Sequence, residues 1–159
     1  MTFVVRELVV AYRSQTIQTQ VPYGTLLATP HDVALLAAAL ETSPGVRFDE
    51  EPCEVAAVLA LSTKHHLLAF HVLSRGSLDT TPVHPREVLR VGLLTNAAGL
   101  ILVHSHPSGD PTPSPDDEML TKRVRQAGEV VGVAVLDHMI LGHDGRYFSF
   151  LERGRLKDV

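Results

Sequence analysis

Two histidines and an aspartate are spaced along residues 104–117 in a way that suits a metal ion. The apolar run over 98–103 predicts a buried strand leading into His104 and His106, and side chains two residues apart in a strand point the same way. Asp117 follows a proline-rich loop. Two imidazoles and one carboxylate leave the fourth position of tetrahedral zinc open for water, as in catalytic zinc sites. The spacing therefore predicts a catalytic metal centre.

The same stretch contains the start of a helix. Ser114 fits the N-cap, Pro115 fits the first helical position, and Asp117 completes a capping box, a pattern that needs no chemistry. As a cap, Ser114 accepts a backbone N–H and can still donate its own proton to an oxygen bound nearby. Asp116 is the competing ligand, but it points to another side of the helix. We expect Asp117 to be the ligand, with plain capping as the alternative.

The full wording of this stretch resembles a known family. The pattern His104-x-His106, seven residues, Ser114-x-x-Asp117 resembles the signature of JAMM (MPN-plus) metalloprotease-like domains, and its proline-rich form resembles the RadC branch. Segments 83–88 (VHPREV) and 136–142 (LDHMILG) are similar to further RadC motifs in order and spacing. The resemblance covers about residues 50–152. A helix-hairpin-helix segment is not recognisable before it, so we expect the short form of the family.

The resemblance implies a fold and a cofactor. The fold is a three-layer α-β-α sandwich with a mixed sheet, the cytidine-deaminase-like layering of JAMM (MPN) domains. The cofactor is Zn2+, held by His104, His106 and Asp117. In this family's chemistry a metal-activated water attacks a carbonyl, and Ser114 would stabilise the oxygen on which charge develops.

A zinc hydrolase also needs a carboxylate near the ion that moves protons. Glu50, Glu51 and Glu54 form an acidic cluster upstream of the metal motif. In JAMM domains the general base is a glutamate at the start of an earlier strand, and Glu54 matches that position. We expect Glu54 to act as base and acid, with Glu50 and Glu51 as alternatives and a surface carboxylate as the structural explanation.

Periodicity and turn residues predict the elements that position these groups. Helices are expected over 30–40, 84–94 and 115–128, and strands over 3–12, 54–62, 67–74, 98–106, 131–141 and 146–150. His84 is expected to cap its helix or to pack. Asp137 and His138 are expected to pack, or to orient a metal ligand from outside the ligand set.

Composition sets limits on the class of protein. A chain of 159 residues with 45% hydrophobic residues predicts one soluble domain over 1–159. It contains no apolar run long enough for a membrane helix, and residues 1–6 lack the basic and apolar pattern of a signal peptide, so we expect a cytoplasmic protein without a membrane partner. Its one cysteine, Cys53, excludes an internal disulfide. The net charge of −4 argues against broad binding to nucleic acid.

The leading hypothesis is a zinc-dependent hydrolase that cuts a peptide or isopeptide bond. Its partner would be a protein or peptide substrate, such as a ubiquitin-like carrier. One alternative follows from the RadC resemblance: a DNA-repair or DNA-processing role, as a nuclease or a DNA-associated factor. A second alternative is a non-catalytic binding module that keeps the loop for folding. No sequence feature sets the oligomeric state.

Overall fold

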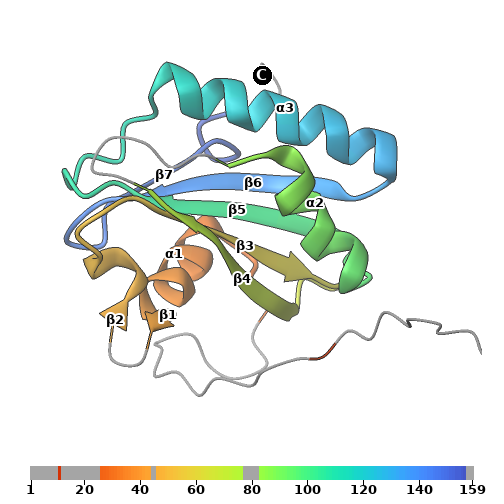
Figure 1. Ribbon diagram of the computed structural model, residues 1–159, viewed down its shortest axis with the longest axis horizontal. Coiled ribbons are helices and arrows are strands. Elements are labelled where there is room, and N and C mark those ends of the chain that lie inside the picture. Colours follow the sequence, from red (N-terminus) through yellow and green to blue (C-terminus); the bar gives the residue numbers. More distant parts are fainter. Residues whose placement is uncertain (1–10, 12–25, 44–45, 77–82, 157–159) are drawn as a thin grey trace, which may run out of the picture.

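A five-stranded mixed sheet forms the centre of the protein, in the strand order β4-β3-β5-β6-β7 (Figure 1). Its strands are β3 (Val55–Leu61), β4 (Leu67–Arg75), β5 (Gly99–Ser105), β6 (Ala134–Leu141) and β7 (Tyr147–Ser149). β5 and β6 pair in parallel, and the other neighbouring strands pair antiparallel. The computed structural model describes residues 11, 26–43, 46–76 and 83–156.

Helices cover both faces of this sheet. α2 (Pro85–Leu94) and α3 (Pro115–Val131) lie on one face, and α1 (Pro30–Ala39) lies on the other (Figure 1). A small ribbon of β1 (Glu41–Ser43) and β2 (Val46–Arg47) and a 3-10 turn, η1 (Phe48–Glu50), follow α1. The predicted α-β-α sandwich with a mixed sheet is confirmed. Among the described residues, no helix is long and apolar enough to cross a membrane.

The two central strands separate two hydrophobic cores. β3 and β5 are buried along their whole length, because helices cover both faces of the sheet. Their side chains alternate between the faces. Leu59 and Val103 belong to the core under α1, whereas Val58 and Leu102 pack with α2 and α3. His104 has the parity of Leu102, so its side chain points toward α3.

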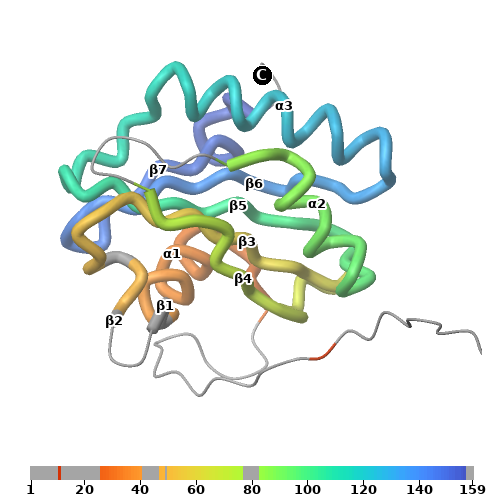
Figure 2. The backbone as a smooth tube through the Cα atoms, viewed as in Figure 1, coloured from red at the N-terminus to blue at the C-terminus, as the bar shows by residue number. Residues whose placement is uncertain are grey.

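The crossover between the parallel strands brings α3 to the metal motif. Figure 2 shows the chain leaving β5, crossing the sheet as α3 and returning as β6 beside β5. A parallel pair requires such a connection. Residues 106–114 connect β5 to α3 and bring the first turn of α3 back to the carboxyl end of β5, where Asp117 lies 3.1 Å from His104.

The predicted end of the third helix and the predicted start of the strand after it were both wrong. α3 extends to Val131 rather than ending near residue 128, and β6 begins at Ala134 rather than at Val131. Gly128 does not end the helix: a Cβ there would lie 2.5 Å from the carbonyl oxygen of Val133, so its small size allows β6 to pass close to α3. The helix ends instead at Gly132, which adopts a left-handed φ of 74°.

The other predicted elements agree more closely. The helices over 30–40 and 84–94 and the strands over 54–62, 67–74, 98–106 and 146–150 match to within one residue at either end. The short strands β1 and β2 were not predicted. The strand predicted over 3–12 lies almost entirely outside the described residues, so a single domain over 1–159 stays a prediction.

Candidate metal centre

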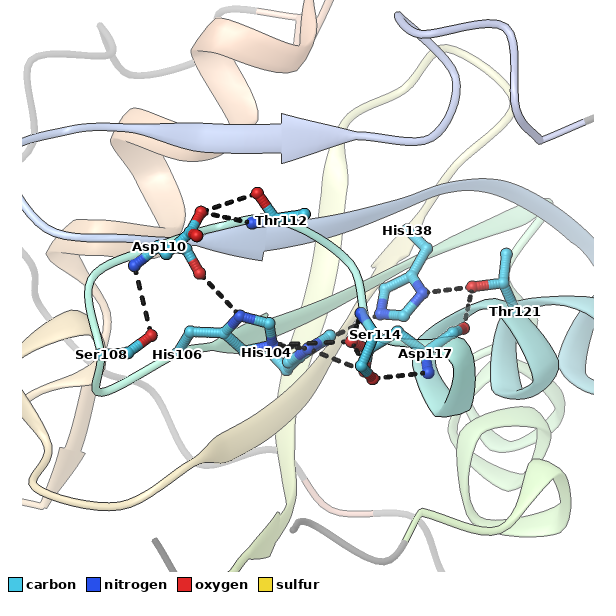
Figure 3. Close-up of polar contacts among 9 residues, drawn as sticks. All are labelled: His104, His106, Ser108, Asp110, Thr112, Ser114, Asp117, Thr121 and His138. Carbon is cyan, nitrogen blue, oxygen red and sulfur yellow. Dashed lines mark hydrogen bonds and ion pairs between the residues drawn. The ribbon is translucent and has the colours of Figure 1, made fainter. Parts of the chain in front are cut away.

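The structure brings His104, His106 and Asp117 together where β5 meets α3 (Figure 3). His104 Nε2 lies 3.0 Å from His106 Nε2 and 3.1 Å from Asp117 Oδ1. His106 Nε2 lies 3.6 Å from Asp117 Oδ2. Among the described residues, these three form the group whose ligand atoms lie close enough for one metal ion, within 4.8 Å of one another. Asp116, the competing ligand, is exposed and outside this group.

The donor atoms suit a metal such as zinc. His106 Nδ1 lies 2.8 Å from the backbone carbonyl oxygen of Asp110, which can only accept a hydrogen bond. Nδ1 must therefore carry the proton, which leaves Nε2 of the neutral ring as the coordinating atom. Ligating histidines in metalloproteins commonly donate their other N–H in this way. The residues present therefore fit a metal ion with nitrogen and oxygen ligands.

The loop between the ligands is held by its own hydrogen bonds (Figure 3). The Asp110 carboxylate accepts from the backbone N–H and the hydroxyl of Thr112, at 3.0 and 2.7 Å, and these bonds lower the pKa of Asp110. Gly109 has a φ of 76°, and a Cβ there would lie 2.6 Å from the ring of His143. The loop therefore packs tightly against the turn after β6, which fixes the carbonyl that His106 needs.

The pKa shifts of Asp117 and His106 favour an ion pair between these two side chains when no metal ion is bound. Burial alone raises the pKa of Asp117, but hydrogen bonds from His104, His106 and Ser114 outweigh it and hold this pKa well below its usual range. Burial lowers the pKa of His106, yet hydrogen bonds to Asp117 and Asp110, with the charges of Asp117 and Glu54, raise it overall. A metal cation would replace the proton on His106 Nε2, while Nδ1 keeps its proton.

The predicted capping box is present and belongs to the same site. Asp117 N–H donates to Ser114 Oγ at 3.2 Å, and the Ser114 hydroxyl and backbone N–H both donate to Asp117 Oδ2 at 2.7 Å. Oδ1 of the same carboxylate faces His104. Capping and ligation are therefore compatible, because each uses one carboxylate oxygen. The Ser114 proton is taken up by Asp117 here, so its role as an oxyanion donor stays a prediction.

The structure separates the three glutamates of the acidic cluster. The side chain of Glu51 is largely buried in an ion pair with Arg75 at 3.0 Å, and exposed Glu50 pairs with Arg47 at 3.3 Å. Glu54 is half-buried directly before β3, and its negative charge contributes to the raised pKa of His106. It therefore lies within electrostatic reach of the ligands.

The strand register supports this placement of Glu54. Ala56 is paired with His104 in the antiparallel β3–β5 ladder. Continuing that register by two residues puts Glu54 level with His106. The position fits the predicted base, although its proton transfer stays a prediction.

Two polar residues behind the ligands extend the site beyond the motif. His138 Nε2 lies 2.9 Å from His104 Nδ1, and Thr121 Oγ1 lies 2.5 Å from His138 Nδ1. Complete burial, followed by the charge of His104, lowers the pKa of His138 well below its ordinary value. The sequence predicted two alternative roles for His138, packing or orienting a metal ligand, and it did not single out Thr121. Its spacing was an available signal, because Thr121 is one helical turn after Asp117.

The neighbouring motif residues have structural partners. His84 caps α2, with Nδ1 accepting from the backbone N–H of Arg86 at 3.2 Å, as one of its predicted roles required. Asp137 is buried, and its carboxylate accepts from Ser149 Oγ and from the backbone N–H groups of His138 and Leu151. Asp137 therefore ties β6 to the segment after β7 and does not contact the ligands.

A family comparison agrees with this fold and these residues. A family model described as the RadC-like JAB domain matches residues 29–155, which is most of the chain. The chain therefore belongs to the RadC-like JAB-domain family, as its motifs predicted.

The curated relatives carry the name UPF0758, which states no activity. The chain is 47% identical to a UPF0758 protein of Thermotoga maritima over 65% of this chain and 46% of the relative. It is 50% identical to one of Pseudomonas fluorescens over 69% and 48%. It is 44% identical to one of Thioalkalivibrio sulfidiphilus over 84% and 56%. The chain thus spans about half the length of the curated relatives it matches.

Proposed function

We propose that this protein is a zinc-dependent hydrolase that cuts a peptide or isopeptide bond. The observation that supports this most directly is the group of His104, His106 and Asp117, together with the half-buried Glu54, whose charge acts on His106. Three protein ligands of this kind leave one tetrahedral position of zinc for solvent or substrate. Zinc, when bound, lowers the pKa of water and polarises a carbonyl oxygen.

The protein's own residues have separate roles in this proposal. Glu54 accepts a proton from the attacking water and delivers it to the leaving amine, as a carboxylate close to the ligands can do. Ser114 donates to the oxygen on which charge develops. Its hydroxyl now bonds Asp117 Oδ2 at 2.7 Å and must rotate away for this task. His104, His106 and Asp117 hold the ion.

The charges around the site favour an amide over a phosphodiester. Phosphodiester cleavage commonly uses cations, often two metal ions about 4 Å apart. The described residues offer one group of metal ligands, and residues 104–117 include Asp110, Asp116 and Asp117 but no Lys or Arg. An amide carbonyl develops one oxyanion, for which one ion and one donor suffice. The proposed partner is therefore a protein or peptide, with a ubiquitin-like tail as the form to test first.

The test compares substrates and two glutamate variants. Zinc-loaded protein is assayed on peptides with Gly-Gly linkages and on single- and double-stranded DNA. We expect zinc-dependent peptide cleavage that falls about 10²–10⁴-fold in Glu54→Gln while zinc content is unchanged. Glu50→Gln is the matched control, since Glu50 is exposed and paired with Arg47, and it should retain activity. DNA cleavage that disappears in both His106→Ala and Glu54→Gln would instead establish a nuclease.

A further inference from the structure

A chain of hydrogen bonds leads from one metal ligand into the protein core and back to another (Figure 3). It starts at His104 Nδ1, which lies 2.9 Å from His138 Nε2. His138 Nδ1 lies 2.5 Å from Thr121 Oγ1, and Thr121 Oγ1 lies 2.6 Å from the backbone carbonyl oxygen of Asp117. The chain therefore connects β5, β6 and α3, and it ends on the backbone of the residue whose side chain is the third ligand.

The last group in this chain sets the direction of every proton. A carbonyl oxygen only accepts, so the Thr121 hydroxyl donates its single proton to Asp117. Thr121 Oγ1 can then only accept from His138, which places the proton of a neutral His138 ring on Nδ1. His138 Nε2 is left as an acceptor, and His104 must donate from Nδ1. With its Nδ1 proton directed at His138, His104 presents Nε2 to His106 and Asp117; Nε2 donates to Asp117 when no metal ion is bound, and it is the atom that a metal ion would use in place of that proton.

The surroundings leave His138 little freedom to adopt another arrangement. His138 is completely buried and Thr121 nearly so, with exposed fractions of 0% and 1%. The His138 ring stacks on Phe150 with 5.2 Å between the ring centroids and 5° between the planes. Burial disfavours a charged imidazolium and excludes water as a substitute partner.

We propose that His138 and Thr121 are positioning residues that hold His104 with the proton on Nδ1 and with Nε2 directed at the metal ion. This inference rests on the metal site of the proposed function. It assigns to the buried motif histidine a role beyond packing. It also explains why Thr121, which follows the ligand-bearing turn of α3, is polar at a position that is almost fully buried.

Two substitutions of His138 distinguish a packing role from a positioning role, because each keeps one property of the side chain and removes the other. His138→Phe keeps an aromatic ring against Phe150 but removes the acceptor for His104. His138→Gln loses the ring, but its amide oxygen can accept from His104 and its NH2 group can donate to Thr121. We expect His138→Phe to weaken zinc binding about 10–100-fold, the usual effect of losing such a partner, and His138→Gln to bind nearly as the parent. The reverse order of affinities would show that packing alone matters.

Thr121 offers a second pair with a matched control. Thr121→Val keeps the shape and loses the hydroxyl, so zinc affinity should fall, and Thr121→Ser should restore it. Thr95 makes the same kind of hydrogen bond, from Oγ1 to the carbonyl of Val91 four residues earlier at 2.8 Å, but in α2. Thr95→Val should therefore leave zinc affinity unchanged. Equal losses in Thr121→Val and Thr95→Val would contradict a role through His138.

The affinities are measured by competition with a chromogenic zinc chelator, and the ring tautomers by 15N NMR of the metal-free parent. The NMR measurement separates this inference from the proposed function, because it needs neither zinc nor a substrate. Protonated Nδ1 and unprotonated Nε2 on His138 support the inference even if the parent cleaves no substrate. The opposite tautomer of His138 overturns it even if hydrolysis is observed.

Discussion

The two histidines of the candidate metal centre are held from opposite sides of the site by different kinds of group. On the core side, His104 contacts a buried side chain, His138, which is held in turn by Thr121. On the loop side, His106 contacts a backbone carbonyl, that of Asp110, in a loop that Thr112 helps to hold. Both partners can fix a proton on Nδ1. Side-chain substitutions should therefore act on the core side, and changes in backbone conformation on the loop side.

The ligand that both sides share should give the largest effect. Asp117→Ala removes a ligand and also the capping box of α3, so we expect zinc binding to be lost in elemental analysis. The metal-free variant should lose about 1 kcal/mol or more of unfolding free energy from the cap. α1 contains the same box, Thr29 with Asp32, at a distance from the ligands. Asp32→Ala should show a comparable cap loss with full zinc content, and full zinc in Asp117→Ala would disprove the ligand assignment.

Sequence alone predicted that His104, His106 and Asp117 come together because they lie close together in the chain. His104, His106 and Asp117 are positioned by one strand end, one loop and one helix start, each with a local signal. The partners of His104 have no such signal. His138 reaches it only because β6 pairs with β5, and the choice of neighbouring strand is not encoded locally.

The fold shows the same division between local and long-range information. The caps and apolar runs placed six elements to within one residue. The predicted end of α3 at residue 128 coincides with Gly128, a residue type of low helix propensity. In the structure its missing side chain makes room for the carbonyl of Val133, a contact with the following strand segment that no local pattern reports.

The loop side should respond to a backbone change that the core side does not experience. In Gly109→Ala, the added methyl group meets the ring of His143, and the alanine must also adopt a positive φ of 76°. The strained φ alone costs about 1–2 kcal/mol, and the contact adds to it. We expect the loop to shift the carbonyl of Asp110 and weaken zinc binding, although less than the loss of a ligand does.

Gly132 provides the control for Gly109. Its φ is 74°, and a Cβ there would meet no atom within 4 Å. Gly132→Ala should therefore lose a similar amount of unfolding free energy through φ alone while zinc affinity stays at the parent level. The measurements are chemical denaturation and chelator competition on the same samples. Equal zinc affinity in both variants would mean that the loop does not position His106.

The smallest expected effect is a pH dependence that arises from His106 on the loop side. As pH rises, the stability of the metal-free protein should fall, whereas its affinity for zinc should rise. In the metal-free protein, hydrogen bonds to Asp117 and Asp110 raise the pKa of His106 above the ordinary histidine value of 6.5. A raised folded-state pKa gives a contribution to stability that is fully present below pH 6.5 and is lost as pH rises through the folded pKa. The unfolding free energy of the metal-free parent should therefore decrease across this window, measured by denaturation at a series of pH values. His106→Gln lacks the titrating group and keeps the other histidines, so its stability should decrease less.

Zinc competes with the same proton of His106, so the zinc affinity of the parent should increase with pH across the window. Metal-free stability that falls equally in the parent and His106→Gln would assign the pH dependence to other groups and remove His106 as its source.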